Sequence, residues 1–167
     1  MKMLIGVVLG ALAVLFGIFI YFATGAAPVA TSSTQMPFEK RLAKMALHAR
    51  LRREMPTNVP YVADEPNLDA GAEVYRENCA VCHGLPNQPE TAVAHGMFPP
   101  PPELFVDTVT RDTVGETYWK TKNGIRLTGM PGFQNSLPDL KLWQVSLLLK
   151  HADKIPPTVQ SILLQTE

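Results

Sequence analysis

The amino-terminal part of the chain contains one long apolar segment. Residues 3–22 form a run of twenty residues without a charged side chain. At about 1.5 Å of rise per residue, a helix of this length spans about 30 Å, which is the thickness of the hydrocarbon core of a bilayer. We therefore predict a transmembrane anchor over residues 1–24. The small residues at 23–30 keep open a cleaved signal sequence, although the apolar part of such a sequence is usually shorter.

An uncharged linker and a basic helical segment follow. Residues 25–37 are mostly small and include two prolines. Residues 38–55 carry apolar side chains at helical spacing, with basic residues between them; these are Phe38, Leu42, Met45, Ala46 and Ala49. We predict a linker and a basic neck helix within residues 25–66. Three roles stay open for this helix: it lies on anionic lipid headgroups, it docks onto a partner membrane protein, or it is a solvated spacer.

Residues 67–151 are predicted to form a small helical domain. Its first helix begins at a cap formed by Asn67 or Asp69 and continues to Cys79. The second helix starts near residue 112 and ends where Asn123 meets a glycine.

The third helix runs over residues 138–151, with a proline in a favourable first position. Its predicted buried face consists of Leu140, Trp143, Leu147 and Leu148. Residues 84–102 contain too much proline and glycine for a regular element, and the tail at 152–167 receives no assignment. Because no segment alternates like a strand, the predicted fold class is all-α.

Charge is distributed unevenly along this chain of zero formal net charge. Residues 1–55 carry seven Lys or Arg against two Glu, a net charge of +5, whereas residues 56–167 carry −5. Such polarity can orient a domain over a charged surface and steer protein partners, most strongly at low salt. We expect lipid around residues 3–22 and no nucleic acid as a partner.

The motif that decides the chemistry is Cys79-Ala80-Val81-Cys82-His83. Two cysteines three positions apart, followed by histidine, form the pentapeptide to which c-type haem is attached. Each thiol can add to one vinyl group of the porphyrin, and the imidazole of His83 can then bind the iron. No second Cys pair exists for a closed zinc site, and no strand context supports a thioredoxin-like site. A structural disulfide would close only a very small loop.

A second axial ligand must come from elsewhere in the chain. Met130 lies between two glycines and is followed by Pro131, so its sulfur is presented on a stiff segment that can approach a flat ring. Met97 and His95 lie close to His83 in sequence and would require a tight wrap around the haem. We therefore predict His83 and Met130 as the iron ligands.

These motifs together resemble the class I c-type cytochromes, specifically a single-haem, membrane-anchored member. The resemblance covers Asn67–Lys150. Cys79, Cys82 and His83 match the attachment site, and Met130 matches the distal ligand loop. The resemblance also matches Gly71 and Tyr75 to a helix that crosses the last helix, where Trp143 and Leu147 would meet them.

The resemblance implies helices around one covalently bound haem c and a role as an electron carrier, not an enzyme. It implies attachment on the exported side of the membrane, which places the haem domain in the periplasm or its equivalent on a single-pass inner-membrane anchor. The basic residues after the anchor would by themselves favour the opposite orientation, but Lys40 lies eighteen residues beyond Phe22. The expected partners are respiratory or photosynthetic redox proteins, with a membrane respiratory complex as the first candidate.

Two alternatives stay open, a haem subunit fixed inside a larger complex and a haem sensor or peroxidase with a displaceable Met130. Candidates for an apolar haem wall are Phe98, Leu104, Tyr118, Trp119, Ile125 and Phe133. We expect the second ring nitrogen of His83 to donate to a backbone carbonyl.

Overall fold

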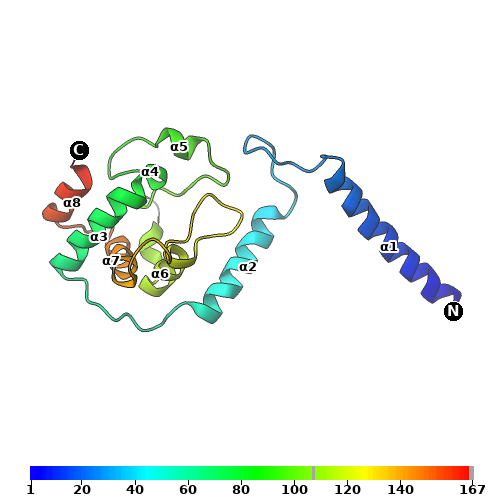
Figure 1. The fold of residues 1–167 in the computed structure, drawn as a ribbon, viewed down its shortest axis with the longest axis horizontal. Coiled ribbons are helices and arrows are strands. Elements are labelled where there is room, and N and C mark those ends of the chain that lie inside the picture. Colours follow the sequence, from blue (N-terminus) through cyan, green and yellow to red (C-terminus); the bar gives the residue numbers. More distant parts are fainter. Residues whose placement is uncertain (107, 166–167) are drawn as a thin grey trace. The chain divides into compact units, whose positions relative to one another are not determined.

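The computed structural model describes residues 1–106 and 108–165, and every regular element within those ranges is a helix (Figure 1). The predicted all-α class is therefore confirmed. The chain divides into two compact units, Met1–Ala43 and Lys44–Glu167. The last two residues of the predicted tail lie outside the described part.

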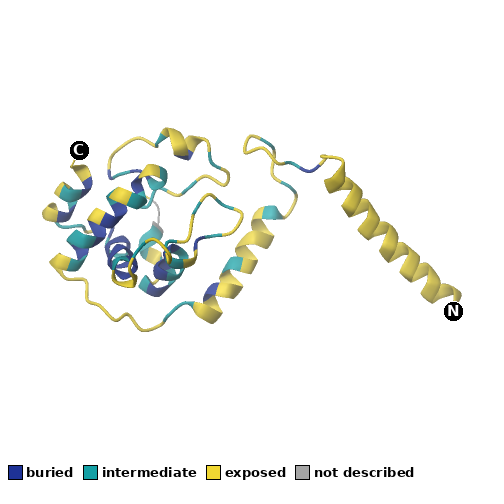
Figure 2. Ribbon diagram, in the orientation of Figure 1, coloured by how far each residue is buried: buried dark blue, intermediate teal, exposed yellow. Residues whose placement is uncertain are grey.

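The first unit contains helix α1, Lys2–Ala23. All of its residues are exposed, as Figure 2 shows. It is the one helix among the described residues that is long and apolar enough to cross a membrane. This agrees with a single-pass anchor, and a signal sequence near the amino terminus has the same character.

The predicted neck helix is confirmed as α2, Glu39–Glu54. Its carboxyl-terminal end packs on the helical domain instead of standing apart from it. Leu51 is buried, and the indole nitrogen of Trp119 donates a hydrogen bond of 3.3 Å to Glu54. A Cβ at Gly115 would overlap the carbonyl oxygen of Pro56. The neck therefore ends in the packed domain, before the boundary expected near residue 67.

Helix α3, Glu65–Asn78, begins earlier than predicted. Its cap is Asp64, whose side chain accepts a hydrogen bond of 3.1 Å from the backbone of Asn67. The prediction of Asn67 or Asp69 as the cap was wrong, because a proline in the first turn already has a helical φ and extends the helix backward.

The core is formed where α3 crosses α7, Asp139–Lys150. Gly71 permits this close approach, since a Cβ there would overlap the carbonyl oxygen of Gln144 and lie 3.1 Å from the Cβ of Leu148. Tyr75 and Leu148 are fully buried in the same cluster. The expected helix crossing is present, but Gln144 and Leu148 make the contact at Gly71.

Two predictions for α7 were wrong. Leu140 is 42% exposed, whereas all residues from Leu142 to Leu149 are buried, so the helix is covered on every side and has no single apolar face. Trp143 does not face α3. Its ring is stacked on Tyr118 with a centroid distance of 3.9 Å, in a second cluster between α7 and α6.

Helix α6, Val114–Asn123, agrees with the second predicted helix, with Thr113 as its cap. The segment between α4, Ala80–His83, and α6 is not wholly irregular as predicted. It contains the single-turn helix α5, Ala92–His95, which is capped by Thr91 and therefore forms despite the surrounding prolines. A short 3-10 helix, η1, spans Thr108–Arg111.

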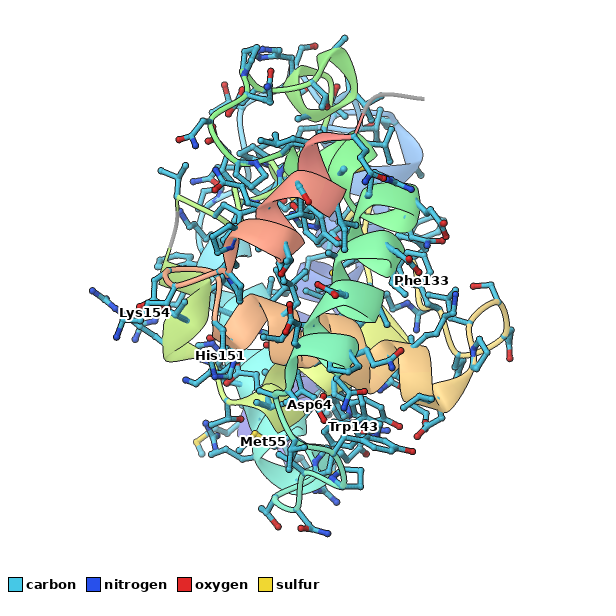
Figure 3. All side chains as sticks on the ribbon, turned by 90° about the vertical axis from the view of Figure 1, so that its left-hand side faces the viewer. Met55, Asp64, Phe133, Trp143, His151 and Lys154 are labelled. Atoms are coloured by element: carbon cyan, nitrogen blue, oxygen red, sulfur yellow. The ribbon has the colours of Figure 1, made fainter. Side chains whose placement is uncertain are left out.

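The unassigned tail also contains a core element. Helix α8, Pro157–Leu164, runs alongside α3, with α7 behind them (Figure 3). Val159 and Leu163 are fully buried in the α3–α7 cluster. Arg76 of α3 donates a hydrogen bond of 3.1 Å to the carbonyl oxygen of Ile162. This helix closes the side of α3 that α7 leaves uncovered.

Candidate haem site

The attachment motif forms a tight turn directly after α3. The backbone nitrogens of Cys82 and His83 donate to the carbonyl oxygen of Cys79 at 3.1 and 2.9 Å, and that of Gly84 donates to Ala80 at 2.9 Å. Gly84 has φ +72°, which favours glycine and ends the turn. Because α4 is a single helical turn, its geometry brings both cysteines and the histidine together at one end of α3.

His83 is oriented by the proline run. Its Nδ1 lies 2.8 Å from the carbonyl oxygen of Pro102. A carbonyl can only accept, so Nδ1 carries the proton and Nε2 keeps its lone pair free for a metal. Burial lowers the pKa of His83, against the opposing effect of the Pro102 hydrogen bond. A neutral imidazole with one nitrogen held by a carbonyl is what an iron ligand requires, so this residue fits a haem.

Tyr75 of α3 stabilises the end of the attachment motif at Gly84. Its hydroxyl donates a hydrogen bond of 2.8 Å to the carbonyl oxygen of Gly84, and both residues are buried. Burial strongly raises the pKa of Tyr75. Its ring meets Phe105 edge to face at a centroid distance of 5.0 Å. The hydroxyl therefore satisfies a carbonyl that would otherwise be buried without a partner.

Both cysteines are free and half-buried, so neither thiol is held in a disulfide. Burial, with a smaller contribution from nearby Cys82, raises the pKa of Cys79 to about 12. Among the described residues, no group of three His, Cys, Asp or Glu side chains could hold a metal ion. The donor set therefore does not favour the zinc alternative.

A hollow beside the motif is lined by segments on both sides of α5. It is bordered by Cys82 and His83, by the polar side chains of Gln88, Glu90 and Glu103, and by apolar side chains. The apolar side chains are Leu85, Ala94, Pro101, Phe105 and Val106. Leu85 and Phe105 were not among the residues expected to line the site. Both residues flank the proline-rich segment, and their position in the sequence could have identified them. That segment brings the carbonyl oxygen of Pro102 into contact with His83.

Met130 lies on a loop that is fixed to the end of α6. Its carbonyl oxygen accepts a hydrogen bond of 3.2 Å from Ile125, and its backbone nitrogen donates to the hydroxyl of Thr128 at 3.1 Å. That hydroxyl donates in turn to Ile125 at 2.6 Å. Beyond Met130, the backbone nitrogen of Phe133 donates to Thr121 at 3.0 Å. The loop therefore presents a half-buried Met130 on a constrained backbone.

The glycines around Met130 allow close contacts within the chain. A Cβ at Gly129 would overlap the terminal methyl of Met97, and a Cβ at Gly132 would lie 2.7 Å from the backbone of Asn123. These two glycines were expected to let the backbone approach a flat ring. Their contacts within the chain are compatible with that role and do not depend on it. Met97 thus lies against the loop that carries the predicted ligand, a relationship that sequence spacing did not reveal.

Some predicted wall residues have other roles. Tyr118 is stacked on Trp143, and the indole nitrogen of Trp119 donates a hydrogen bond to Glu54, so both side chains have contacts away from the attachment motif. Leu104 packs against the α3–α7 cluster, and Phe133 packs against the cluster that contains Trp143. Ile125 and Phe98 lie at the surface in part, with Phe98 36% exposed.

The remaining histidines are engaged elsewhere. His95 forms a pair with Glu90 at 3.2 Å on the surface, and His151 lies 2.9 Å from the carbonyl oxygen of Leu147 at the end of α7. His48 is exposed on α2. These positions agree with the choice of His83 as the histidine of the site.

Residues 66–147 match the family model described as cytochrome C oxidase, cbb3-type, subunit III. The match includes α3, the attachment motif, the Met130 loop and most of α7. No curated protein and no solved structure matched the chain.

Proposed function

Since residues 66–147 form a c-type cytochrome domain, whose family binds haem c and transfers electrons, we propose that this chain carries one electron at a time between redox partner proteins. The observation that carries the proposal is the hydrogen bond from His83 to Pro102, which leaves Nε2 free beside two unbonded thiols. Covalently bound haem would supply an iron that cycles between the ferrous and ferric states.

The residues proposed to hold one haem are Cys79 and Cys82 through thioethers, and His83 and Met130 through the iron. His83 is held by Pro102, and the Met130 backbone is held by Thr128 and Ile125. Ligands held in this way move little when the charge changes, which lowers the reorganisation that accompanies electron transfer. A thioether opposite an imidazole also favours the reduced form and raises the reduction potential.

The proposed setting is the inner membrane, with α1 as a single-pass anchor and the haem domain on the periplasmic or outer side. The length and composition of α1 support the anchor. Attachment of this kind of haem on the exported side supports the orientation. Covalent haem and tethering together suit a carrier that exchanges electrons with a respiratory or photosynthetic membrane complex.

A second candidate is a haem subunit fixed inside a larger membrane complex. The matched family model is itself described as the third subunit of a cbb3-type oxidase, and this favours the second candidate. Affinity purification of the full chain from native membranes separates the two. Stoichiometric co-purification of oxidase or other complex subunits supports a fixed subunit, whereas substoichiometric, salt-sensitive recovery supports a shuttle.

A redox titration of the full, natively matured chain tests the proposed ligand set. We expect a single one-electron transition and a charge-transfer absorption from Met130 to ferric iron. Met130→Ala should abolish this absorption and lower the reduction potential, while the matched variant Met97→Ala should retain the absorption. Loss of the absorption in Met97→Ala alone would assign the ligand to Met97 instead.

A retained absorption in Met130→Ala would contradict the proposed distal ligand. Tight carbon monoxide binding by the unmodified ferrous chain would support the sensor or peroxidase alternative, because a firmly held sixth ligand blocks that position.

A further inference from the structure

Helix α2 has one side directed into the domain. Leu51 is only 3% exposed. Glu54, about one helical turn later, accepts the hydrogen bond from Trp119. The carbonyl oxygen of Pro56, just after the helix, lies in contact with Gly115. These contacts fix which side of residues 44–54 can meet another molecule. Figure 2 shows that most of α2 is exposed.

The opposite side of α2 carries an apolar stripe. Leu42 and Met45 are 56% and 61% exposed, and Ala46 and Ala49 are exposed as well. Their spacing of three, four and seven residues places them on one face of a helix with 3.6 residues per turn. By the same period, Ala49 lies almost opposite Leu51. The stripe is therefore not used by the packing that buries Leu51.

Arginines border this stripe on both edges. By the helical period, Arg41 and Arg52 lie along one edge and Arg50 lies along the other, while Arg53 follows Ala46 and Ala49 on the stripe itself, at the carboxyl-terminal end of the helix. Arg50 is paired with Glu54 at 2.7 Å. Within the part of the chain that the structure describes, no ion pair is formed by Arg41, Arg52 or Arg53. An exposed apolar stripe between arginines is the pattern of a helix that lies in a membrane interface.

If α1 is an anchor, a membrane surface lies within reach of α2. Fifteen residues separate the end of α1 at Ala23 from the start of α2 at Glu39. Fully extended, they reach about 50 Å, at about 3.3–3.6 Å per residue. The tether therefore keeps α2 near the leaflet from which the chain emerges and raises the local concentration of lipid headgroups around it.

We propose that α2 lies in the plane of an anionic lipid leaflet, with the stripe of Leu42, Met45, Ala46 and Ala49 inserted and the arginines on the headgroups. The inference relies on the anchor in the proposed function. Because Leu51 and Glu54 connect the other side of α2 to the domain, docking of the helix fixes the orientation of the haem domain over the membrane. Each arginine near an anionic surface contributes about 1 kcal/mol to binding.

The experiment uses the full, haem-loaded chain in lipid nanodiscs with a spin label at Ala49→Cys. Cys79 and Cys82 are consumed by thioether bonds in this form, so the introduced thiol is labelled selectively. Discs contain either phosphatidylcholine alone or phosphatidylcholine with phosphatidylglycerol. We expect the label in anionic discs to be more accessible to dissolved oxygen than to a water-soluble nickel complex. A label at Glu73→Cys, exposed on α3, should show the reverse.

Charge variants supply the matched control. Arg52→Gln/Arg53→Gln should weaken partition of α2 into anionic discs about 30-fold, which corresponds to about 2 kcal/mol. Arg111→Gln/Lys154→Gln removes the same charge from other exposed positions and should leave the Ala49 label unchanged.

Three results overturn the proposal: a water-accessible label in anionic discs, equal protection in discs without anionic lipid, and protection that requires a co-purified protein subunit. The last result would assign the stripe to protein docking. Co-elution of the red, haem-loaded chain with the discs shows separately whether α1 anchors the chain in the bilayer. A chain that co-elutes while its Ala49 label stays in water refutes this inference and leaves the proposed anchor intact.

Discussion

The Nδ1 of His83 lies 2.8 Å from the carbonyl oxygen of Pro102, nineteen positions later in the chain. This contact joins the attachment turn to the proline-rich segment and determines the tautomer of the imidazole. A carbonyl in a proline run moves little, since each ring holds its φ near one value. The long segment between α4 and α6 therefore orients His83, the proposed iron ligand, which gives its proline content a structural purpose.

Substitution of Gly71 tests the crossing of α3 and α7. In Gly71→Ala the added methyl would overlap the carbonyl oxygen of Gln144, so the helices must separate. We expect a loss of about 1–3 kcal/mol in the free energy of unfolding, because overpacking forces the backbone to shift. Denaturant unfolding measures it. Gly96→Ala, whose Cβ would find its nearest neighbour at 3.6 Å, is the control and should remain near the parent value.

Tyr75→Phe removes the hydroxyl that satisfies the buried carbonyl of Gly84. We expect destabilisation by about 1–3 kcal/mol, the cost of leaving one buried acceptor without a partner. Tyr61→Phe, at a residue 38% exposed, serves as the matched control and should change stability little. Equal stability of the two variants would show that the Tyr75 hydroxyl does not support the motif.

Gly129→Ala tests the contact between Met97 and the loop that presents Met130. The new methyl would overlap the terminal methyl of Met97. Because that end of Met97 is flexible, we expect a moderate loss of about 1 kcal/mol, with a weakened charge-transfer absorption. Chemical denaturation and absorption spectra of the matured chain measure both effects.

Truncation of the Met97 side chain should remove its overlap with the methyl group added in Gly129→Ala. Gly129→Ala/Met97→Ala should recover the absorption lost in Gly129→Ala, which a double-mutant cycle reports as a coupling between the two sites. Purely additive effects would show that Met97 does not determine the position of the loop.

The sequence predicted those features that depend on local periodicity or on a fixed spacing. The neck, the second helix and the third helix agree with α2, α6 and α7, since each has caps or breakers close by. The expectation that His83 would meet a backbone carbonyl was confirmed by its contact with Pro102. Which carbonyl it meets depends on a loop path that local sequence does not determine.

Long-range packing accounts for the errors. Trp143 and Leu140 fit one apolar face by periodicity, but α7 is surrounded by α3, α6 and η1, so its buried surface extends around the helix. The tail could not be assigned because α8 is short and is stabilised by burial of Val159 and Leu163 against α3. Likewise, the contact between Met97 and Gly129 joins two loops that have no common periodic pattern.

We propose that haem is joined covalently to the sulfurs of Cys79 and Cys82, and intact-mass analysis of the full chain after native maturation tests this attachment. We expect a red protein whose mass exceeds that of the polypeptide by one haem, with no thiol left to alkylate. Attachment should be impaired in Cys82→Ser. A colourless polypeptide of unmodified mass with two reactive thiols would contradict covalent attachment.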